Sequence, residues 1–235
     1  MNLLLVTQQE IDDQGCVLLT DRRHQHIRKV HRLGMGDTLQ AGVVNGSVGE
    51  AKIIEQQTEA TRLRLNLCRQ PPTPLPVTLL LALPRPRMLA RSLEHLTSLG
   101  VKKLVLMQTN RVEKSYWQSP ELKPEKIYQH LILGLEQAKD TLLPEVLLKK
   151  RFKPFVEDEL PTLAADSRRL VAHPGNYPAC PRNIDQQLTL AIGPEGGFVD
   201  FEIQLLEAQG FQPVQIGERI LRVETAVTAL LARLF

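Results

Sequence analysis

Residues 188–198 of this chain read Leu188-Thr189-Leu190-Ala191-Ile192-Gly193-Pro194-Glu195-Gly196-Gly197-Phe198. A short apolar run of strand length enters a turn with three glycines and a proline. Glycine permits positive φ and lets backbone amides approach a ligand closely, while proline stiffens the turn. A helix is predicted at residues 201–209, with Asp200 as its candidate N-cap. The segment therefore predicts strand, rigid loop and helix; a plain turn without a ligand is the alternative.

The same alternation continues on both sides of this segment. Strand-length apolar runs at 77–83, 103–107 and 213–216 alternate with helical leucine stripes at 89–99 and 127–138. Strands that alternate with helices predict an α/β fold with a parallel sheet covered on both faces. Ligands of such sheets bind at the carboxyl ends of the strands. The glycine spacing fits neither a dinucleotide-binding fingerprint nor a Walker loop.

A second loop of interest follows the run at 213–216 and reads Gly217-Glu218-Arg219-Ile220-Leu221-Arg222-Val223-Glu224-Thr225-Ala226. A helix is predicted at 226–234. Ile220 and Leu221 can form an apolar wall beside the charges of Arg219, Arg222 and Glu224, as in many ligand pockets. An ion-paired surface turn is the alternative.

The first part of the chain has a different pattern. Short alternating segments at 38–44, 48–54 and 61–67 are separated by glycines, and a helix is predicted near 21–33. Four prolines within residues 71–76 then prevent helix or central strand. We therefore expect a small β-barrel domain at 1–70, a linker at 71–76 and the α/β domain at 77–235.

Composition and charge limit the function classes. The chain is 43% hydrophobic and 23% charged, which excludes a disordered or disulfide-scaffold protein. No apolar run approaches the about 18–20 residues that span a bilayer, and three scattered cysteines indicate a reducing compartment, so we expect a cytoplasmic protein without zinc or other metal. Residues 71–156 carry fourteen Lys and Arg against seven Asp and Glu. This excess is compatible with RNA as a partner or with a merely solvated face.

The two loops together resemble the RsmE family of SPOUT-class methyltransferases. The hallmarks of that family are a GPEGG-F loop with a nearby Glu, and a G-x-R-I-L-R-x-E-T-A segment. Residues Gly193–Phe198 with Glu202, and Gly217–Ala226, reproduce both in order. The resemblance implies methylation of uridine N3 in 16S ribosomal RNA with S-adenosylmethionine as the cofactor. It also implies a carboxyl-terminal trefoil knot, a PUA-like RNA-binding barrel, a homodimer, and ribosomal RNA or the small ribosomal subunit as the partner.

The resemblance and the chemistry together give candidate site residues. We expect Arg222 and Glu195 to be catalytic, with Arg222 stabilising charge on the uracil oxygens. Glu195 and Glu224 are both candidates to accept the proton; the alternative for each is to hold a backbone amide or an arginine, and this structural role is favoured for Glu224. The residues expected at the cofactor are His173, Ile192, Gly193, Pro194, Glu195, Gly196, Ile216, Gly217, Ile220, Leu221, Glu224, Thr225 and Ala226. For RNA we expect Arg22, Arg23, Arg28, Lys29, Arg32, Arg85, Arg87 and Arg111. Trp117 is expected in a core more than against a base.

Some family positions differ. The segment Pro84-Arg85-Pro86-Arg87 stands where the family has Lys-Gly, so basic groups that face the RNA have changed. Two alternatives therefore stay open: a related methyltransferase with another target nucleotide, and an RNA-binding or ribosome-binding protein of the same fold without catalysis.

Overall fold

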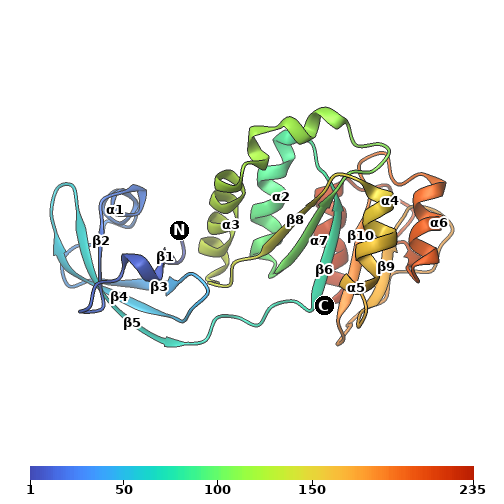
Figure 1. The fold of residues 1–235 in the computed structure, drawn as a ribbon. Coiled ribbons are helices and arrows are strands. Elements are labelled where there is room, and N and C mark those ends of the chain that lie inside the picture. Colours follow the sequence, from blue (N-terminus) through green and yellow to red (C-terminus); the bar gives the residue numbers. More distant parts are fainter. The chain divides into compact units, whose positions relative to one another are not determined.

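The computed structural model describes residues 1–235 and divides them into two compact units. The first unit comprises Met1–Thr73 and Leu131–Leu143, and the second comprises Pro74–His130 and Pro144–Phe235 (Figure 1). None of the helices combines the length and apolar character needed to cross a membrane.

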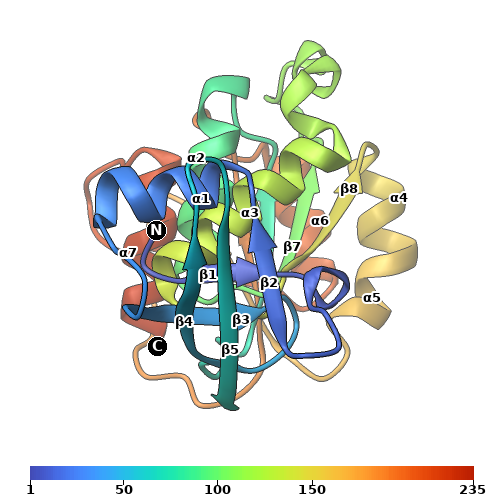
Figure 2. The same cartoon turned by 90° about the vertical axis from the view of Figure 1, so that its left-hand side faces the viewer.

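The first unit is built on a five-stranded sheet with the order β1-β3-β4-β5-β2. Its strands are β1 (Leu4–Val6), β2 (Cys16–Leu19), β3 (Thr38–Val43), β4 (Val48–Gln56) and β5 (Thr61–Arg69). The long strands β4 and β5 run beside β2 in Figure 2, with α1 (Arg22–His26) next to them. The three strands and the helix predicted in this region are present, and α1 continues as a π-helical segment, Ile27–His31.

One glycine is required by the packing of this sheet. A Cβ atom on Gly49 would lie 2.1 Å from the carbonyl oxygen of Asn66 on the neighbouring strand β5. No side chain fits at that distance, so glycine permits β4 and β5 to approach at the irregularity in their register between Val48 and Gly49.

Residues Leu131–Leu143 belong to the first unit, although the sequence pattern predicts them in the 77–235 domain. They include the end of α3 (Pro124–Ala138), where Ile132 and Leu135 pack with Leu3 and Leu5. The Asn45 amide donates to the Thr141 carbonyl at 2.8 Å. Helical periodicity identifies an apolar face but not the core that it meets, which is why the sequence did not assign this segment.

The second unit contains a six-stranded parallel sheet with the order β11-β9-β10-β6-β7-β8. Its strands are β6 (Val77–Ala82), β7 (Lys103–Met107), β8 (Glu145–Lys149), β9 (Arg168–Ala172), β10 (Leu188–Ile192) and β11 (Gln212–Val214). The predicted α/β class and the parallel sheet are thus confirmed. All five residues of β10 are buried, because strands flank it on both sides and helices cover its faces.

Helices lie on both sides of this sheet (Figure 1). Helices α2 (Pro86–Ser98) and α7 (Val223–Leu234) lie on one side, and α4 (Phe152–Pro154), α5 (Leu160–Leu163) and α6 (Asp200–Ala208) on the other. On the second side, Phe155, Leu160 and Leu206 pack with Val105 and Ala191 of the sheet. The carboxyl ends of β9, β10 and β11 therefore meet at one edge, where the two predicted loops lie.

Candidate active site

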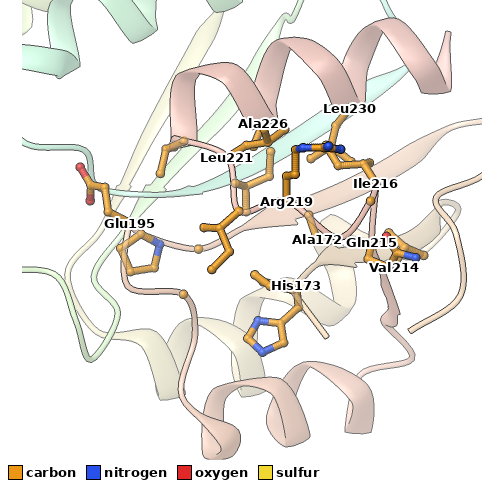
Figure 3. A pocket seen from close by; sticks show the side chains of 18 residues that line it. Ala172, His173, Glu195, Val214, Gln215, Ile216, Arg219, Leu221, Ala226 and Leu230 are labelled. Carbon is orange, nitrogen blue, oxygen red and sulfur yellow. The ribbon is translucent and has the colours of Figure 1, made fainter. Parts of the chain in front are cut away.

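A cavity lies at the carboxyl ends of three neighbouring strands, β9, β10 and β11 (Figure 3). Ala226 and Leu230 of α7 line one side, His173 lies on the other, and Leu221 lies between them. Glu195 marks one end of the cavity and Gln215 the opposite end. The wall is mostly apolar with a few polar groups, as is usual for sites that bind small molecules.

The glycine loop after β10 forms a tight turn against a buried ring. The Gly197 amide donates to the Pro194 carbonyl at 2.7 Å, and Gly197 has φ +75°, a left-handed conformation that favours glycine. A Cβ atom on Gly193 would lie 3.0 Å from the ring of Phe198, which is buried. The predicted strand and glycine turn are both present, and backbone lines the cavity at this point.

Glu202 stabilises the start of α6. Its carboxylate accepts the Val199 amide at 3.0 Å, so Val199 is the N-cap residue and Asp200 is already helical. The expectation that Asp200 caps this helix is therefore wrong. A Glu in the first turn can reach back to the N-cap amide and fill the role of a capping side chain.

The second loop, 217–222, is more open. Gly217 has φ +149°, and the Ile220 side chain is 81% exposed. Helix α7 begins at Val223, three residues before the predicted start at Ala226. Arg219 and Leu221 from this loop line the cavity.

Two buried polar atoms in residues that line the cavity have no hydrogen-bond partner. They are Nδ1 of His173 and Oε1 of Gln215. Burial lowers the pKa of His173, and Arg111 lowers it further, while Asp200 acts in the opposite direction. A buried polar atom without a partner is costly, by about 1–3 kcal/mol, so these two atoms favour a ligand that hydrogen-bonds to them.

Most of the residues predicted at a cofactor line this cavity, and some do not. Those that do are His173, Ile192, Gly193, Pro194, Glu195, Ile216, Gly217, Ile220, Leu221 and Ala226. Gly196, Glu224 and Thr225 are not part of its lining. Eight further residues also line it. Gly197, Arg219 and Val223 belong to the two predicted loops and Ala172 and Pro174 flank the predicted His173, whereas Val214, Gln215 and Leu230 were not predicted. Several of these are ordinary strand or helix residues, whose role depends only on where the sheet edges meet.

A second, larger cavity of about 810 Å³ adjoins Glu195. It is lined by Arg85, Pro86, Arg87, Met88, Tyr116, Glu195, Arg222 and Glu224. Both residues predicted to be catalytic, Arg222 and Glu195, line it, and Glu195 lines the first cavity as well. The Arg85 guanidinium lies 3.4 Å from the Glu195 carboxylate. The site thus consists of two cavities that share one carboxylate.

The comparisons with known proteins agree with this geometry. A family model described as an RNA methyltransferase domain matches residues 71–235. The ribosomal RNA small subunit methyltransferase E of Treponema pallidum (strain Nichols) is 33% identical, over 99% of this chain and 90% of the relative. That of Synechocystis sp. is 32% identical, over 98% of this chain and 76% of the relative.

The chain belongs to the RNA methyltransferase E family. The predicted resemblance and the predicted class of enzyme, a methyltransferase of ribosomal RNA, are thereby confirmed. A solved structure of a ribosomal RNA small subunit methyltransferase E from Neisseria gonorrhoeae bound to S-adenosyl methionine has a TM-score of 0.77 and 19% identity, and the match covers 99% of this chain and 95% of that one. This likeness shows that the fold is shared.

In this methyltransferase, several arginines predicted to bind RNA have partners within the protein. Both Arg22 amino groups donate to the Glu136 carboxylate, and Arg23 forms ion pairs with Glu10 and Asp21. Burial acts to raise the pKa of Glu10, but hydrogen bonds from Arg23 and Thr7 hold it below its ordinary value. These pairs indicate a structural role for Arg22 and Arg23.

The remaining predicted RNA contacts differ in their surroundings. Arg28 donates to the Thr58 carbonyl and Arg111 to the Gly196 carbonyl, whereas Lys29, Arg32 and Arg87 are exposed side chains. The Trp117 indole donates to Gln108 Oε1 at 2.6 Å, and this partner favours a structural role over base stacking.

Proposed function

We propose that this enzyme uses S-adenosylmethionine to methylate N3 of a uridine in 16S ribosomal RNA. The observation that carries the proposal is the pair of cavities joined at Glu195, one at the glycine loop and one among arginines. The first would hold the methyl donor and the second the target base, so that the donor and the base meet beside one carboxylate. The names of the relatives supply ribosomal RNA as the substrate class.

The first cavity fits the chemistry of an adenosyl ligand. Nδ1 of His173 and Oε1 of Gln215 can pair with hydroxyl or amino groups, while Ile192, Leu221 and Leu230 supply apolar walls for the base. Backbone amides of the glycine loop can reach acceptor atoms that side chains would block. The remaining predicted residues Gly196, Glu224 and Thr225 would act by shaping the loops.

Binding requires one movement. The cavity measures about 100 Å³, whereas pockets for small molecules usually measure about 300–1,000 Å³. The exposed loop 217–222 would therefore move outward when the donor enters. Its Ile220 is suited to close over an adenine, since burying that exposed side chain would stabilise the closed form.

The chemistry assigns one task to each charged residue. When bound, S-adenosylmethionine supplies an electrophilic methyl group on a sulfonium cation. Uracil N3 carries a proton at neutral pH, and Glu195 would accept it at the junction of the cavities. Arg222 would stabilise the negative charge that then develops on the uracil oxygens. Glu224 would hold the loop.

Finer features of the family belong to the same proposal. We assign a PUA-like RNA-binding barrel to residues 1–70, with 131–143 packed into the same unit, a linker to 71–76 and a SPOUT domain with a trefoil knot to the rest of 77–235. The enzyme would act as a homodimer in the cytoplasm, with Lys29, Arg32, Arg85 and Arg87 near the ribosomal RNA. The parallel sheet and the glycine loop at its edge support the assignment of the methyltransferase domain.

The basic residues of the second cavity keep another target nucleotide as a candidate. Arg85 and Arg87, where the family pattern has Lys-Gly, both line the proposed base cavity. Arginine presents a planar fork that lysine lacks, so a changed set of basic groups can alter which nucleotide is held.

The decisive experiment is mass-spectrometric nucleoside mapping of 16S ribosomal RNA from cells that lack this protein. We expect one N3-methyluridine to disappear and to return with the wild-type gene but not with Arg222→Ala. Loss of a different methylated nucleoside would establish the second target. If no nucleoside changes, and calorimetry with S-adenosylmethionine gives no heat, the chain is a binding protein without catalysis.

A further inference from the structure

A buried carboxylate joins two loops at the edge of the parallel sheet. Glu202 is 3% exposed, and its two oxygens serve different partners. One accepts the Val199 amide of the glycine loop at 3.0 Å, and the other accepts the Asn110 amide, after β7, at 2.6 Å. Hydrogen bonds to charged acceptors are about twice as strong as those between neutral groups, and the amino-terminal turn of α6 favours negative charge.

A second contact joins the same two loops. The Arg111 guanidinium donates to the carbonyl oxygen of Gly196. The Arg111 side chain also passes so close that a Cβ atom on Gly196 would lie 2.9 Å from its Cδ. The loop after β7 is therefore fastened to the glycine loop at both Asn110 and Arg111.

The loop after β7 continues as a braced segment to the second cavity. The Gln108 side chain donates to the Val112 carbonyl at 2.8 Å and accepts from the Trp117 indole. The neighbouring Tyr116 lines the cavity that we assign to the target base. Hydrogen bonds and the chain itself thus connect the glycine loop, through Glu202 and Gln108, to Trp117 and the adjacent Tyr116.

The loop also contains an unsatisfied group. Thr109 is buried, and its hydroxyl has no hydrogen-bond partner. Such a group favours conformations in which it reaches water. The contacts of Glu202 and Arg111 hold the loop in place although this hydroxyl stays unpaired.

We propose that Glu202 is a positioning residue that couples the two cavities, so that cofactor and RNA each strengthen the binding of the other. This inference rests on the proposed function and adds to it a source of cooperativity. A ligand that orders the glycine loop also orders the Asn110–Tyr116 segment through the shared carboxylate. By thermodynamic linkage, RNA then increases cofactor affinity by the same factor.

The test is titration calorimetry with S-adenosylhomocysteine, which binds without turnover, in the absence and presence of an unmodified 16S ribosomal RNA transcript. For the wild type we expect RNA to tighten cofactor binding by about fivefold or more. In Glu202→Gln, the amide nitrogen cannot accept a hydrogen bond, so one loop is released. We expect the factor to fall to near one, and amide hydrogen exchange at residues 109–112 to quicken.

Glu207→Gln, on the exposed side of the same helix, is the matched control and should keep the wild-type factor. If Glu202→Gln fails to fold, Arg111→Ala releases the second contact from an exposed position and should lower the same factor. Equal factors in wild type and Glu202→Gln, or no coupling in the wild type, would overturn the inference. Absence of cofactor binding in the wild type would instead overturn the proposed function.

Discussion

At the scale of single residues, the glycine loop requires glycine at two positions for different reasons, one steric and one conformational. Gly196 is not among the glycines with positive φ, so its requirement for glycine comes from its neighbour Arg111. Gly197 differs, because its φ of +75° is itself unfavourable for other residues. The glycine spacing in the sequence predicts a tight loop but does not distinguish these two reasons.

Gly196→Val should weaken cofactor binding at least tenfold while the protein stays folded. The new side chain would push Arg111 away and shift the loop that lines the first cavity. Calorimetry with S-adenosylmethionine measures the affinity, and circular dichroism checks the fold. Gly34→Val is the control, since no atom lies within 4 Å of a Cβ there. Unchanged affinity in Gly196→Val would show that this loop does not bind the cofactor.

The half-buried His173 should make stability depend on pH. Burial lowers its pKa in the folded protein, so below its ordinary pKa of 6.5 the unfolded chain binds more protons. The contribution of His173 is therefore complete above pH 6.5 and is lost as the pH falls through the lower, folded-state pKa. Urea unfolding at pH 5.5 and 7.5 measures this difference, which should be smaller in His173→Gln. An equal difference in both proteins would contradict it.

At the scale of elements, hydrophobic periodicity predicted those strands and helices whose limits depend on the local sequence pattern. The limits of β7 and β10 match the predicted runs, since each is a buried apolar segment bounded by turns. Strand β1 was not predicted, because three residues carry no periodicity. Helix α7 begins earlier than expected, because its first turn contains Val223 and Glu224, which the sequence assigned to a loop.

The element α3 shows why tertiary partners escape such predictions. The Glu136 side chain, 3% exposed, is paired with Arg22, and its backbone carbonyl accepts the amides of Asn2 and Leu3. Nothing local in the sequence around Glu136 identifies a partner more than one hundred residues away. Arg22 was accordingly predicted to bind RNA instead of a carboxylate.

Glu136→Ala should lower the free energy of unfolding of the first unit. The loss should be about 1–3 kcal/mol, since Arg22 and the buried surroundings lose their partner. Urea denaturation measures the loss. Gln137→Ala, exposed on the same helix and in the same unit, should cost less than about 0.5 kcal/mol. Equal stability of both variants would contradict a structural role for the pair.

At the scale of the whole molecule, the distribution of basic residues indicates an RNA-binding surface only when arginines paired with carboxylates of the protein are left out. The sequence counts every arginine as available, but the structure commits Arg22 and Arg23 to carboxylates and leaves Arg87 exposed. The candidate site likewise depends on tertiary contacts that the sequence does not show. The sequence predicted both loops, but not Gln215 or Leu230, which reach the cavity because β11 ends beside β9 and α7 lines one side of the cavity.

RNA affinity should therefore respond differently to two arginine substitutions. Arg87→Ala should lower the slope of log affinity against log salt by about one, as expected for a lost phosphate contact. Arg23→Ala should leave the slope unchanged and lower stability, since Arg23 forms its ion pairs with Glu10 and Asp21 of the protein itself. Filter binding across a salt series measures both slopes. A reduced slope for Arg23→Ala would return that residue to the RNA interface.

Because residues 131–143 belong to the first unit, the two units cannot be separated by a single cut in the chain. Cutting the chain at the proline-rich linker would strand Ile132 and Leu135 on a fragment that lacks Leu3 and Leu5. Each half would then carry an uncovered apolar surface and tend to aggregate. Neither unit can therefore be transferred alone to a fusion protein, because each contains chain segments that lie on the far side of the linker in the sequence.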